Sequence, residues 1–509
     1  MAGSIIENLS GRKLSILISL LMICQLLCFL IGGLIGPAPT SVMTALRRIC
    51  LDKNYDENKW YYTRGKGSCH IINSINTPEI TNQHDISGNN LVFVFQIPLP
   101  KDNIELDFSR WQQNMIAMLV VDIPINDDHS DVTDAILTID ARLGYKNKNE
   151  TKWKELAKSV EDRRLSCEPP ENKNSESVYK CNPIPLYELG SIHHDYYLLN
   201  LRFPNYIKGY EKEVNRLDID VNEVHMINGG FTKVWVSLKT VFFPCIIAIM
   251  FWFWNRISQL SRPAALLEYM LMCLGGALTF LNVPLEYLSL FVDCPWMTLV
   301  GDIRQGLFYA ALLSFWLIFA GEHLMDDTER NRIQVYWRHL SAVLTGCLCL
   351  FIFDMCERGV QLKNPFYSIW ATEIGTNLAL AFIIIAGICA GLYFCFLSFM
   401  VYKVFLNISS KRKSLPAMAS SRRLKYEGII YRFKVLMLAT LLCAAVTVIA
   451  FIMGQIIKAA LEKKLNLADL FRNRQNYRLF LLMPKNLRLI EGRDLAFLYR
   501  LVKVYLSKF

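Results

Sequence analysis

Charged residues are scarce in this chain of 509 residues: they make up 20% of it, whereas hydrophobic residues make up 53%. This balance excludes an intrinsically disordered chain and argues against a wholly soluble one. Histidine is also rare, with eight scattered residues, and no G-x-S-x-G, H-E-x-x-H or P-loop motif occurs. The enzymes that use those motifs therefore have no support. We expect no catalytic activity, no metal and no cofactor.

The net charge of +10 is unevenly distributed. Residues 458–509 hold 12 Lys and Arg against 4 Asp and Glu, a balance of +8. Elsewhere the basic residues lie beside long apolar runs. This pattern argues against a nucleic-acid partner and predicts a protein that contacts membrane lipids.

Seven apolar runs have the length and composition of membrane spans. The first, residues 14–35, is longer than the apolar region of a usual signal peptide and has no clear cleavage site, which favours a retained anchor over a signal peptide. The other runs cover residues 234–254, 264–284, 296–320, 340–357, 375–402 and 433–457. Short loops on one side hold 13 Lys and Arg, whereas those on the other side hold Arg358 and Lys363. The positive-inside rule therefore makes the N-terminus cytosolic and residues 36–233 luminal or extracellular.

The segment 36–233 differs in character from the rest of the chain. Apolar and polar residues alternate at 91–97, 135–143, 197–203 and 217–221, which predicts half-buried strands of a β-sandwich or barrel. Residues 228–230 (Asn-Gly-Gly) are expected to form a flexible turn into the second span. We thus divide the chain into an anchor (1–35), a luminal β domain (36–233), a helical bundle (234–457) and an atypical basic tail (458–509).

Four cysteines in the luminal domain predict two disulfides. Short loops favour the pairs Cys50–Cys69 and Cys167–Cys181, with free buried thiols as the alternative. Asn149 begins a glycosylation sequon on the same side.

Ionisable residues at the luminal ends of the spans mark the candidate site, because charge is costly there and must face a cavity or another charge. They are Glu286, Asp302, Arg304, Asp354, Glu357 and Arg358. Two interpretations stay open: a structural cap of ion pairs, or a polar mouth over an apolar cavity. Asp302 and Arg304 do not share a helix face, so each is expected to find its partner on another helix. The candidate residues for binding a lipid and its cargo protein are Trp296, Asp302, Arg304, Leu307, Phe308, Phe351, Asp354, Phe366, Tyr367 and Trp370.

A sorting motif lies in the largest loop predicted to be cytosolic. Tyr426 and Ile429 fit the tyrosine-x-x-bulky-apolar pattern that clathrin adaptors bind as an extended strand.

Several blocks of the sequence resemble the Wntless family of cargo receptors. The matching blocks are residues 1–8 (MAGSIIEN), 228–235 (NGGFTKVW), 301–309 (GDIRQGLFY), 313–319, 351–361 (FIFDMCERGVQ), 364–370 (NPFYSIW), 381–389 and 415–427. The resemblance covers roughly residues 1–457. It implies a multi-pass α-helical membrane protein with a seven-helix-type bundle like that of G-protein-coupled receptors, and a luminal β-sandwich after the first transmembrane helix.

The resemblance also implies a function and partners. The protein is expected to bind acylated Wnt proteins, to shelter the acyl chain among its helices, and to carry Wnt from the endoplasmic reticulum and Golgi to the cell surface. Clathrin adaptors and retromer-type sorting machinery, with endosomal passage, are further expected partners. The family continues to an eighth span, whereas residues after Gln455 look unrelated, as in an alternative isoform or a faulty gene model. Retrieval to the endoplasmic reticulum is therefore not expected for this chain.

Two other classes compete with the cargo receptor. A seven-helix signalling receptor needs a D-R-Y-type triplet and an N-P-x-x-Y motif in its last span, and neither occurs. A membrane-embedded acyl enzyme needs a histidine inside a span, and none of the predicted spans contains one.

Overall fold

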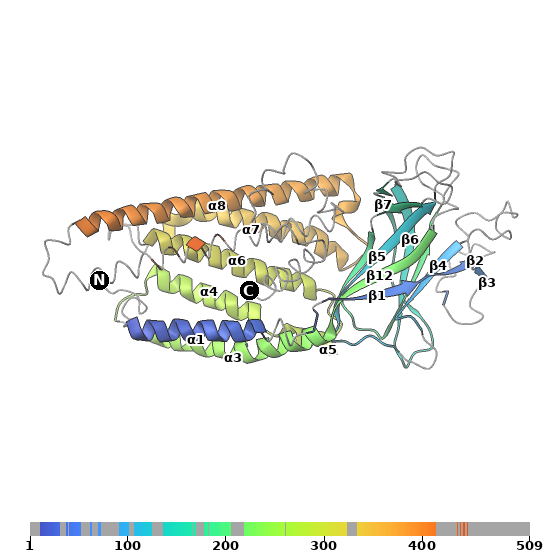
Figure 1. Cartoon of the computed structure of the whole chain (residues 1–509), viewed down its shortest axis with the longest axis horizontal. Helices are drawn as coiled ribbons and strands as arrows, with labels where there is room; N and C mark the ends of the chain where they lie inside the picture. The colour runs from blue at the N-terminus through green and yellow to red at the C-terminus, as the bar shows by residue number, and fades with distance from the viewer. Residues whose placement is uncertain are drawn as a thin grey trace, which may run out of the picture.

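The computed structural model places a β domain at one end of a set of long helices (Figure 1). It describes residues 11–30, 37–38, 40–51, 62–63, 70–72, 91–100, 106–124, 136–165, 167–168, 178–181, 183–204, 218–259, 261–322, 333–413, 435, 438, 441–442 and 445.

The β domain consists of two antiparallel sheets, as described over these residues. The first sheet has the order β1 (Thr40–Leu46), β12 (Asp218–Ile227), β5 (Gln113–Pro124), β9 (Val178–Cys181) and β8 (Cys167–Glu168), and β10 (Ile184–Ser191) also pairs with β5. The second has the order β3 (His70–Ile72), β2 (Arg48–Leu51), β4 (Leu91–Ile97), β11 (Tyr196–Arg202), β6 (Ile136–Lys146) and β7 (Lys154–Arg164). Their facing sides bury one apolar core, which includes Phe95, Leu119, Leu143 and Leu199. The predicted β-sandwich is therefore confirmed.

The strands predicted from alternation are present, but the prediction of half-burial is wrong for β4 and β11. Both strands are buried along nearly their whole length. Their inward side chains join the main core, and their outward side chains Val92, Val94 and Leu198 form a second cluster with Cys50 and Tyr62. Central strands that are covered on both faces lose the alternation of burial that an exposed face would give.

The long helices follow the predicted spans closely. They are α1 (Gly11–Leu30), α3 (Gly229–Ser258), α4 (Leu266–Asn282), α6 (Met297–Glu322), α7 (Ile333–Gln361) and α8 (Glu373–Lys413). The short α5 (Leu288–Phe291) and the 3-10 turns η4 (Leu285–Tyr287) and η5 (Ile369–Ala371) lie in the connections. Among the described residues, five helices are long and apolar enough to cross a membrane. The seventh predicted run lies mostly outside the described residues, although Val435, Leu438, Leu441, Leu442 and Ala445 are helical.

The entry into α3 differs from the prediction. Asn228 is the N-cap of the helix, and its side-chain oxygen accepts a hydrogen bond of 2.8 Å from the backbone N–H of Gly230. Gly229 and Gly230 therefore form the first turn of α3, because the asparagine satisfies a backbone donor that would otherwise lack a partner. The expected flexible turn is wrong.

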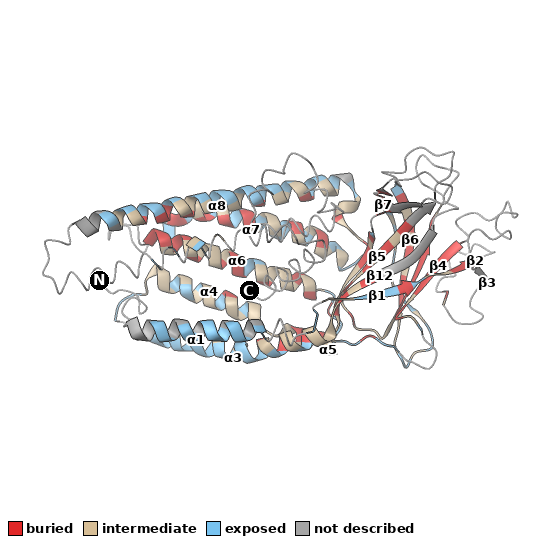
Figure 2. Cartoon of the chain, in the orientation of Figure 1, coloured by how far each residue is buried: buried red, intermediate tan, exposed pale blue. Residues whose placement is uncertain are grey.

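The helices pack as neighbours in chain order, from α3 through α4, α6 and α7 to α8. At the ends far from the β domain, α6, α7 and α8 share a cluster that includes Ile318, Tyr336 and Leu397. Elsewhere many apolar side chains face outward, as the exposed surfaces of α1, α3 and α8 in Figure 2 indicate. Only 6% to 33% of the residues in the most apolar stretch of each spanning helix are buried. Such surfaces require a lipid environment.

Candidate functional site

The connection between α7 and α8 reaches into the β domain. Phe366 is 2% exposed and belongs to the main core of the sandwich, where its ring meets that of Tyr187 edge to face at 5.7 Å. The backbone carbonyl of Phe366 accepts a hydrogen bond from the guanidinium of Arg163 in β7. Desolvation lowers the pKa of this buried arginine. The bundle thus contributes a core residue to the β domain.

Other contacts also join the β domain to the helical bundle at this junction. The backbone N–H of Glu188 in β10 donates to the carbonyl of Pro365 at 3.0 Å. The side chain of Gln113 donates to Ser289 at 3.1 Å, and Ser191 donates to Asp293 at 2.8 Å. A Cβ atom at Gly190 would lie 2.5 Å from the carbonyl oxygen of Pro295, so only glycine allows this close approach. The β domain therefore lies directly over the ends of α6 and α7.

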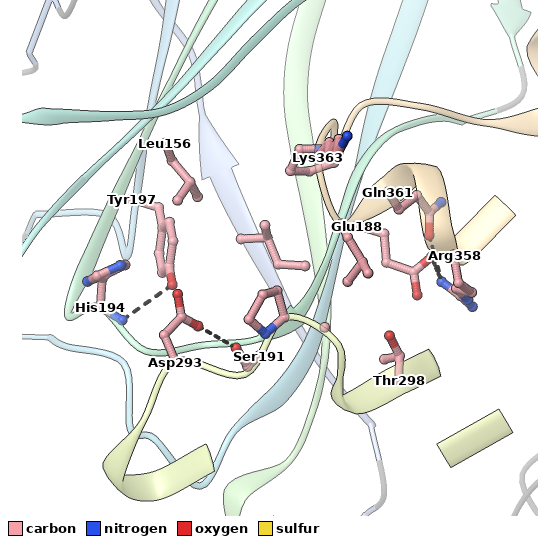
Figure 3. A pocket seen from close by; sticks show the side chains of 15 residues that line it. Leu156, Glu188, Ser191, His194, Tyr197, Asp293, Thr298, Arg358, Gln361 and Lys363 are labelled. Atoms are coloured by element: carbon pink, nitrogen blue, oxygen red, sulfur yellow. Dashed lines mark hydrogen bonds and ion pairs between the residues drawn. The ribbon is translucent and has the colours of Figure 1, made fainter. Parts of the chain in front are cut away.

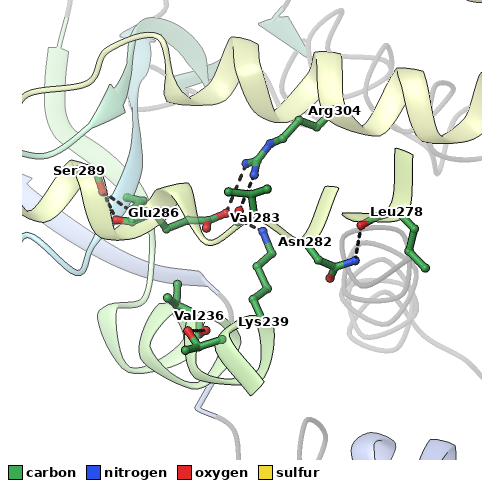
Figure 4. Close-up of polar contacts among 10 residues, drawn as sticks. Val236, Lys239, Leu278, Asn282, Val283, Glu286, Ser289 and Arg304 are labelled. Atoms are coloured by element: carbon green, nitrogen blue, oxygen red, sulfur yellow. Dashed lines mark hydrogen bonds and ion pairs between the residues drawn. The ribbon is translucent and has the colours of Figure 1, made fainter. Parts of the chain in front are cut away.

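One buried ion cluster joins three elements of the bundle (Figure 4). The carboxylate of Glu286 in η4 lies 2.6 Å from Lys239 of α3 and 3.5 Å from Arg304 of α6. Arg304 also donates to the carbonyl of Val283 at 2.9 Å. All three charged side chains are nearly inaccessible to solvent. Burial makes the balance of charge important, because a buried charge without a counter-ion is strongly destabilising.

A second ion cluster joins the bundle to the β domain. The guanidinium of Arg358 in α7 pairs with Glu188 of β10 and lies 3.7 Å from Asp302 of α6. Asp302 and Arg304 were predicted to find partners on other helices, and this is confirmed: Asp302 lies near Arg358 of α7, and Arg304 pairs with Glu286 of the 3-10 helix η4. Both clusters lie at the junction, which supports the interpretation as a cap of ion pairs.

A cavity of about 140 Å³ opens beside the second cluster (Figure 3). Its polar lining includes Glu188, His194, Asp293, Arg358 and Lys363. These groups carry both signs of charge, so the cavity suits water or small polar groups better than an acyl chain. Among the described residues, no group of three His, Cys, Asp or Glu side chains is arranged to hold a metal ion.

His194 forms one wall of this cavity. Its ring stacks on Tyr145 with the centroids 3.8 Å apart, and its Nδ1 atom lies 3.2 Å from the side-chain oxygen of Asn147. Burial lowers the pKa of His194, and the nearby carboxylate of Asp293 opposes this shift. Burial also raises the pKa of the Tyr197 hydroxyl above its usual range. The wall is therefore uncharged near neutral pH.

The aromatic and apolar candidates of the bundle fall into three groups. Phe308 is buried against α4 in a cluster with Ala277, and Phe366 fills the β-domain core, which leaves neither ring free to line a ligand slot. The half-buried residues Trp296, Tyr367 and Trp370, together with Asp354 of α7, lie at or near the junction. Leu307 and Phe351 are 52% and 44% exposed.

Leu307 and Phe351 lie at one level on neighbouring helices. Leu307 is ten residues from the start of α6 at Met297, and Phe351 is ten residues from the end of α7 at Gln361. At 1.5 Å per residue, each lies about 15 Å from the junction. Of the predicted residues, these two best combine exposure with depth in the apolar zone.

Two charged residues of the ion clusters were not predicted. Lys239 interrupts the apolar run at 234–254, and a charge inside such a run is a signal that could have identified it. Glu188 lies in a strand of mixed composition, so nothing in the sequence distinguishes it.

The covalent predictions are partly confirmed. Cys167 and Cys181 form a disulfide between paired strands. Cys50 is also disulfide-bonded, but Cys69 lies outside the described residues, so this pairing stays a prediction. Asn149 is exposed in the turn between β6 and β7, where a glycan would meet no obstacle, and its modification stays a prediction. Tyr426 and Ile429 lie outside the described residues.

Two family models match the chain. The model described as "Wntless-like, transmembrane domain" matches residues 228–485, and the one described as "Wntless, GOLD domain" matches residues 48–228. "Protein wntless" of Drosophila virilis is 53% identical over 469 residues, which are 89% of this chain and 83% of that protein. The same-named protein of Drosophila grimshawi is 53% identical over 472 residues. The first family match runs to residue 485, past the expected end of the resemblance near residue 457, whereas the two relatives cover 89% of the chain.

Proposed function

The chain belongs to the Wntless family, and from this premise we propose that it is a cargo receptor for acylated Wnt proteins. In this proposal the β domain contacts the protein part of Wnt, and the membrane helices shelter its acyl chain. The receptor carries the pair from the endoplasmic reticulum and Golgi to the cell surface. No catalytic step is needed.

The physical need for such a receptor follows from the hydrophobic effect. Each methylene of an acyl chain costs about 0.8 kcal/mol when it is exposed to water, so a long chain costs on the order of 10 kcal/mol. A secreted protein with this modification requires a partner that covers the chain and also recognises the protein.

The observation that carries the proposal is the position of the β domain. Phe366 and the Arg358–Glu188 pair fix it over the ends of α6 and α7. A protein bound there has membrane helices directly beneath it. Exposed apolar side chains, among them Leu307 and Phe351, lie about 15 Å further along these helices. An acyl chain on the bound protein can reach that depth without crossing water.

Co-purification tests this proposal. The full chain is expressed with Wnt or with a Wnt variant that lacks the acylated residue, and recovery of each is compared. We expect recovery of the acylated form only. Equal recovery of the two forms would defeat the proposal.

A set of variants tests the depth of the acyl site. Leu307→Ala with Phe351→Ala should lower the recovery of acylated Wnt about tenfold, because roughly 1.4 kcal/mol of apolar contact is lost. Ile384→Ala is the matched control, since Ile384 is 59% exposed on α8 at nearly the same depth. If the control lowers recovery as much, the acyl chain does not lie between α6 and α7.

We also propose that Tyr426 and Ile429 form an endocytic signal that clathrin adaptors bind, and that retromer-type machinery returns the receptor from endosomes. Their spacing and their place in the basic loop after Arg422 and Arg423 support this. Tyr426→Ala should raise the amount of receptor at the cell surface, measured by surface biotinylation. An unchanged surface level would remove the endocytic role.

A further inference from the structure

Two apolar side chains at the β-domain end of the bundle stand out by their exposure. Among the described residues, Ile374 and Phe291 are the most exposed large apolar side chains, at 84% and 78%. Ile374 lies in the first turn of α8, and Phe291 is the last residue of α5. Figure 1 shows these two elements beside the β domain, on opposite sides of the row of helices. Near Phe291, Leu288 and Val292 are also exposed, and we call these four residues the apolar rim.

The apolar rim continues the lipid-facing surface of the bundle on both sides. The hydroxyl of Thr240 in α3 donates to that of Tyr287 at 3.1 Å, which places η4 and α5 beside the exposed Val241 of α3. On the other side, the exposed Leu378 lies one turn of α8 below Ile374. Exposed apolar side chains on membrane helices face acyl chains. The rim is therefore continuous with a surface that lipid already covers.

The length of α3 places one side of the rim at the membrane surface. The 30 residues of α3 span about 45 Å, the thickness of a bilayer with its headgroups, of which about 30 Å is hydrocarbon. Thr240 follows the first residue of α3 by 240 − 229 = 11 residues, or about 17 Å, and so lies within the hydrocarbon. From this depth η4 and α5 return to the β domain. Phe291 and Val292 therefore lie near the boundary between acyl chains and headgroups.

The charges of α8 give a similar level for the other side of the rim. Glu373 directly precedes Ile374, and the next charged residue is Lys403. These two charges are 403 − 373 = 30 residues apart, or about 45 Å along the helix, which again matches a bilayer with its headgroups. Because charge is costly within the hydrocarbon, both belong to the headgroup regions. Ile374 thus lies at the inner side of the headgroups.

The protein holds the rim in place, so the rim cannot turn inward to leave water. The guanidinium of Arg110, just before β5, donates to the backbone carbonyl of Leu290 at 3.0 Å. The hydroxyl of Thr376 donates to the carbonyl of Trp370 in η5 at 3.2 Å, and η5 packs against β7. Both sides of the rim are therefore fixed to the β domain.

We propose that the apolar rim inserts into the leaflet on the β-domain side, at the boundary between headgroups and acyl chains. Its partner is the lipid bilayer, which removes these side chains from water. Phe and Leu are typical of segments that lie at this boundary. The polar side begins directly after Val292, because the exposed Asp293 accepts a hydrogen bond from Ser191 of the β domain at 2.8 Å.

Fluorescence quenching in liposomes tests the insertion. An environment-sensitive naphthyl amino acid replaces Phe291 in the full chain, which is reconstituted in phosphatidylcholine. We expect stronger quenching by a lipid with a doxyl group near the top of its acyl chain than by one with the group near the chain end, and little quenching by aqueous iodide. The same residue at Val160 of β7 is the matched control, since Val160 is 62% exposed on the β domain, and it should respond to iodide only. At Val241, equally exposed on α3, the deeper doxyl group should quench more strongly.

Two results would overturn the proposal. Quenching by iodide as strong as at Val160 would show that Phe291 faces water. Quenching by neither iodide nor lipid would show that protein covers it, either another part of this chain or a second copy. Placing the probe at Val292 repeats the test in case the first substitution disturbs folding. Placing it at Ile374 tests the other side of the rim, where strong quenching by iodide would refute insertion of α8 at this level.

Discussion

The substitution Glu286→Gln should destabilise the bundle more than any other single change in its buried ion clusters. The carboxylate of Glu286 is 2.6 Å from Lys239 and 3.5 Å from Arg304, and all three side chains are buried. Glutamine keeps the shape but removes the negative charge, which leaves two buried cations without a counter-ion. The expected loss is about 3–5 kcal/mol. Lys239→Met should cost less, about 1–3 kcal/mol, because Glu286 still pairs with Arg304.

The assay is thermal unfolding of the purified full chain in detergent. A loss of this size lowers the melting temperature by about 10 °C for a domain of this length. Glu268→Gln is the matched control: the same substitution in the Arg262 pair, where the arginine side chain is 42% exposed, should cost no more than about 1 kcal/mol. The reasoning is refuted if Glu286→Gln melts like the wild type, or if Lys239→Met is the more harmful of the two.

Three further predictions concern the β domain and its attachment. Phe366→Ala should cost about 3–5 kcal/mol, because it leaves a cavity in the main core, and limited proteolysis should then separate the β domain from the bundle; a wild-type digestion pattern would contradict this. Burial lowers the pKa of His194, so folding favours the neutral ring. The stability that this preference contributes is full above a pH near 6.5, the pKa of histidine in the unfolded chain, and is lost as the pH falls through the lower pKa of the folded protein. His194→Gln should therefore flatten the melting temperature between pH 7 and pH 5, and an unchanged profile would exclude this histidine as the cause. Replacing Cys167 and Cys181 with Ser should cost about 3 kcal/mol, as expected for the 14-residue separation that the disulfide closes, and equal denaturant midpoints would show that the bond adds no stability.

The parts of the fold that could be predicted are those with a strong local pattern. The alternation at 91–97 matches β4 residue for residue, and the long apolar runs match α4 and α6 within two residues at each end. The strand β7 could not be found in this way. It runs Lys-Glu-Leu-Ala-Lys-Ser-Val-Glu-Asp-Arg-Arg, and its few apolar residues give almost no alternation. It is a strand because β6 pairs with it along most of its length, which is tertiary information.

The sequence predicted that charged residues lie at the luminal ends of the helices, but not which of them form ion pairs. Charge at the ends of apolar runs correctly identified Asp302, Arg304 and Arg358 as residues that need partners. One partner, Glu188 of Arg358, lies on a strand whose position depends on how the β domain docks. The sequence shows that unpaired charges at these positions would be destabilising. Which charges pair depends on distances that only the folded structure gives.

Phe366 shows most clearly why the roles of single residues could not be read from the sequence. It lies among aromatic residues at a helix end, where lining a lipid slot and packing at the interface are both physically reasonable. The structure instead inserts it beside Tyr187 of the sandwich, 179 residues earlier in the chain. This contact links the α7–α8 connection to β10, and the Arg358–Glu188 pair links α7 to the same strand. In the proposed function, a movement of α7 away from α6 that admits an acyl chain would therefore also shift β10. Under the proposed function, such a link would let the β domain and the helices respond to what the other part has bound.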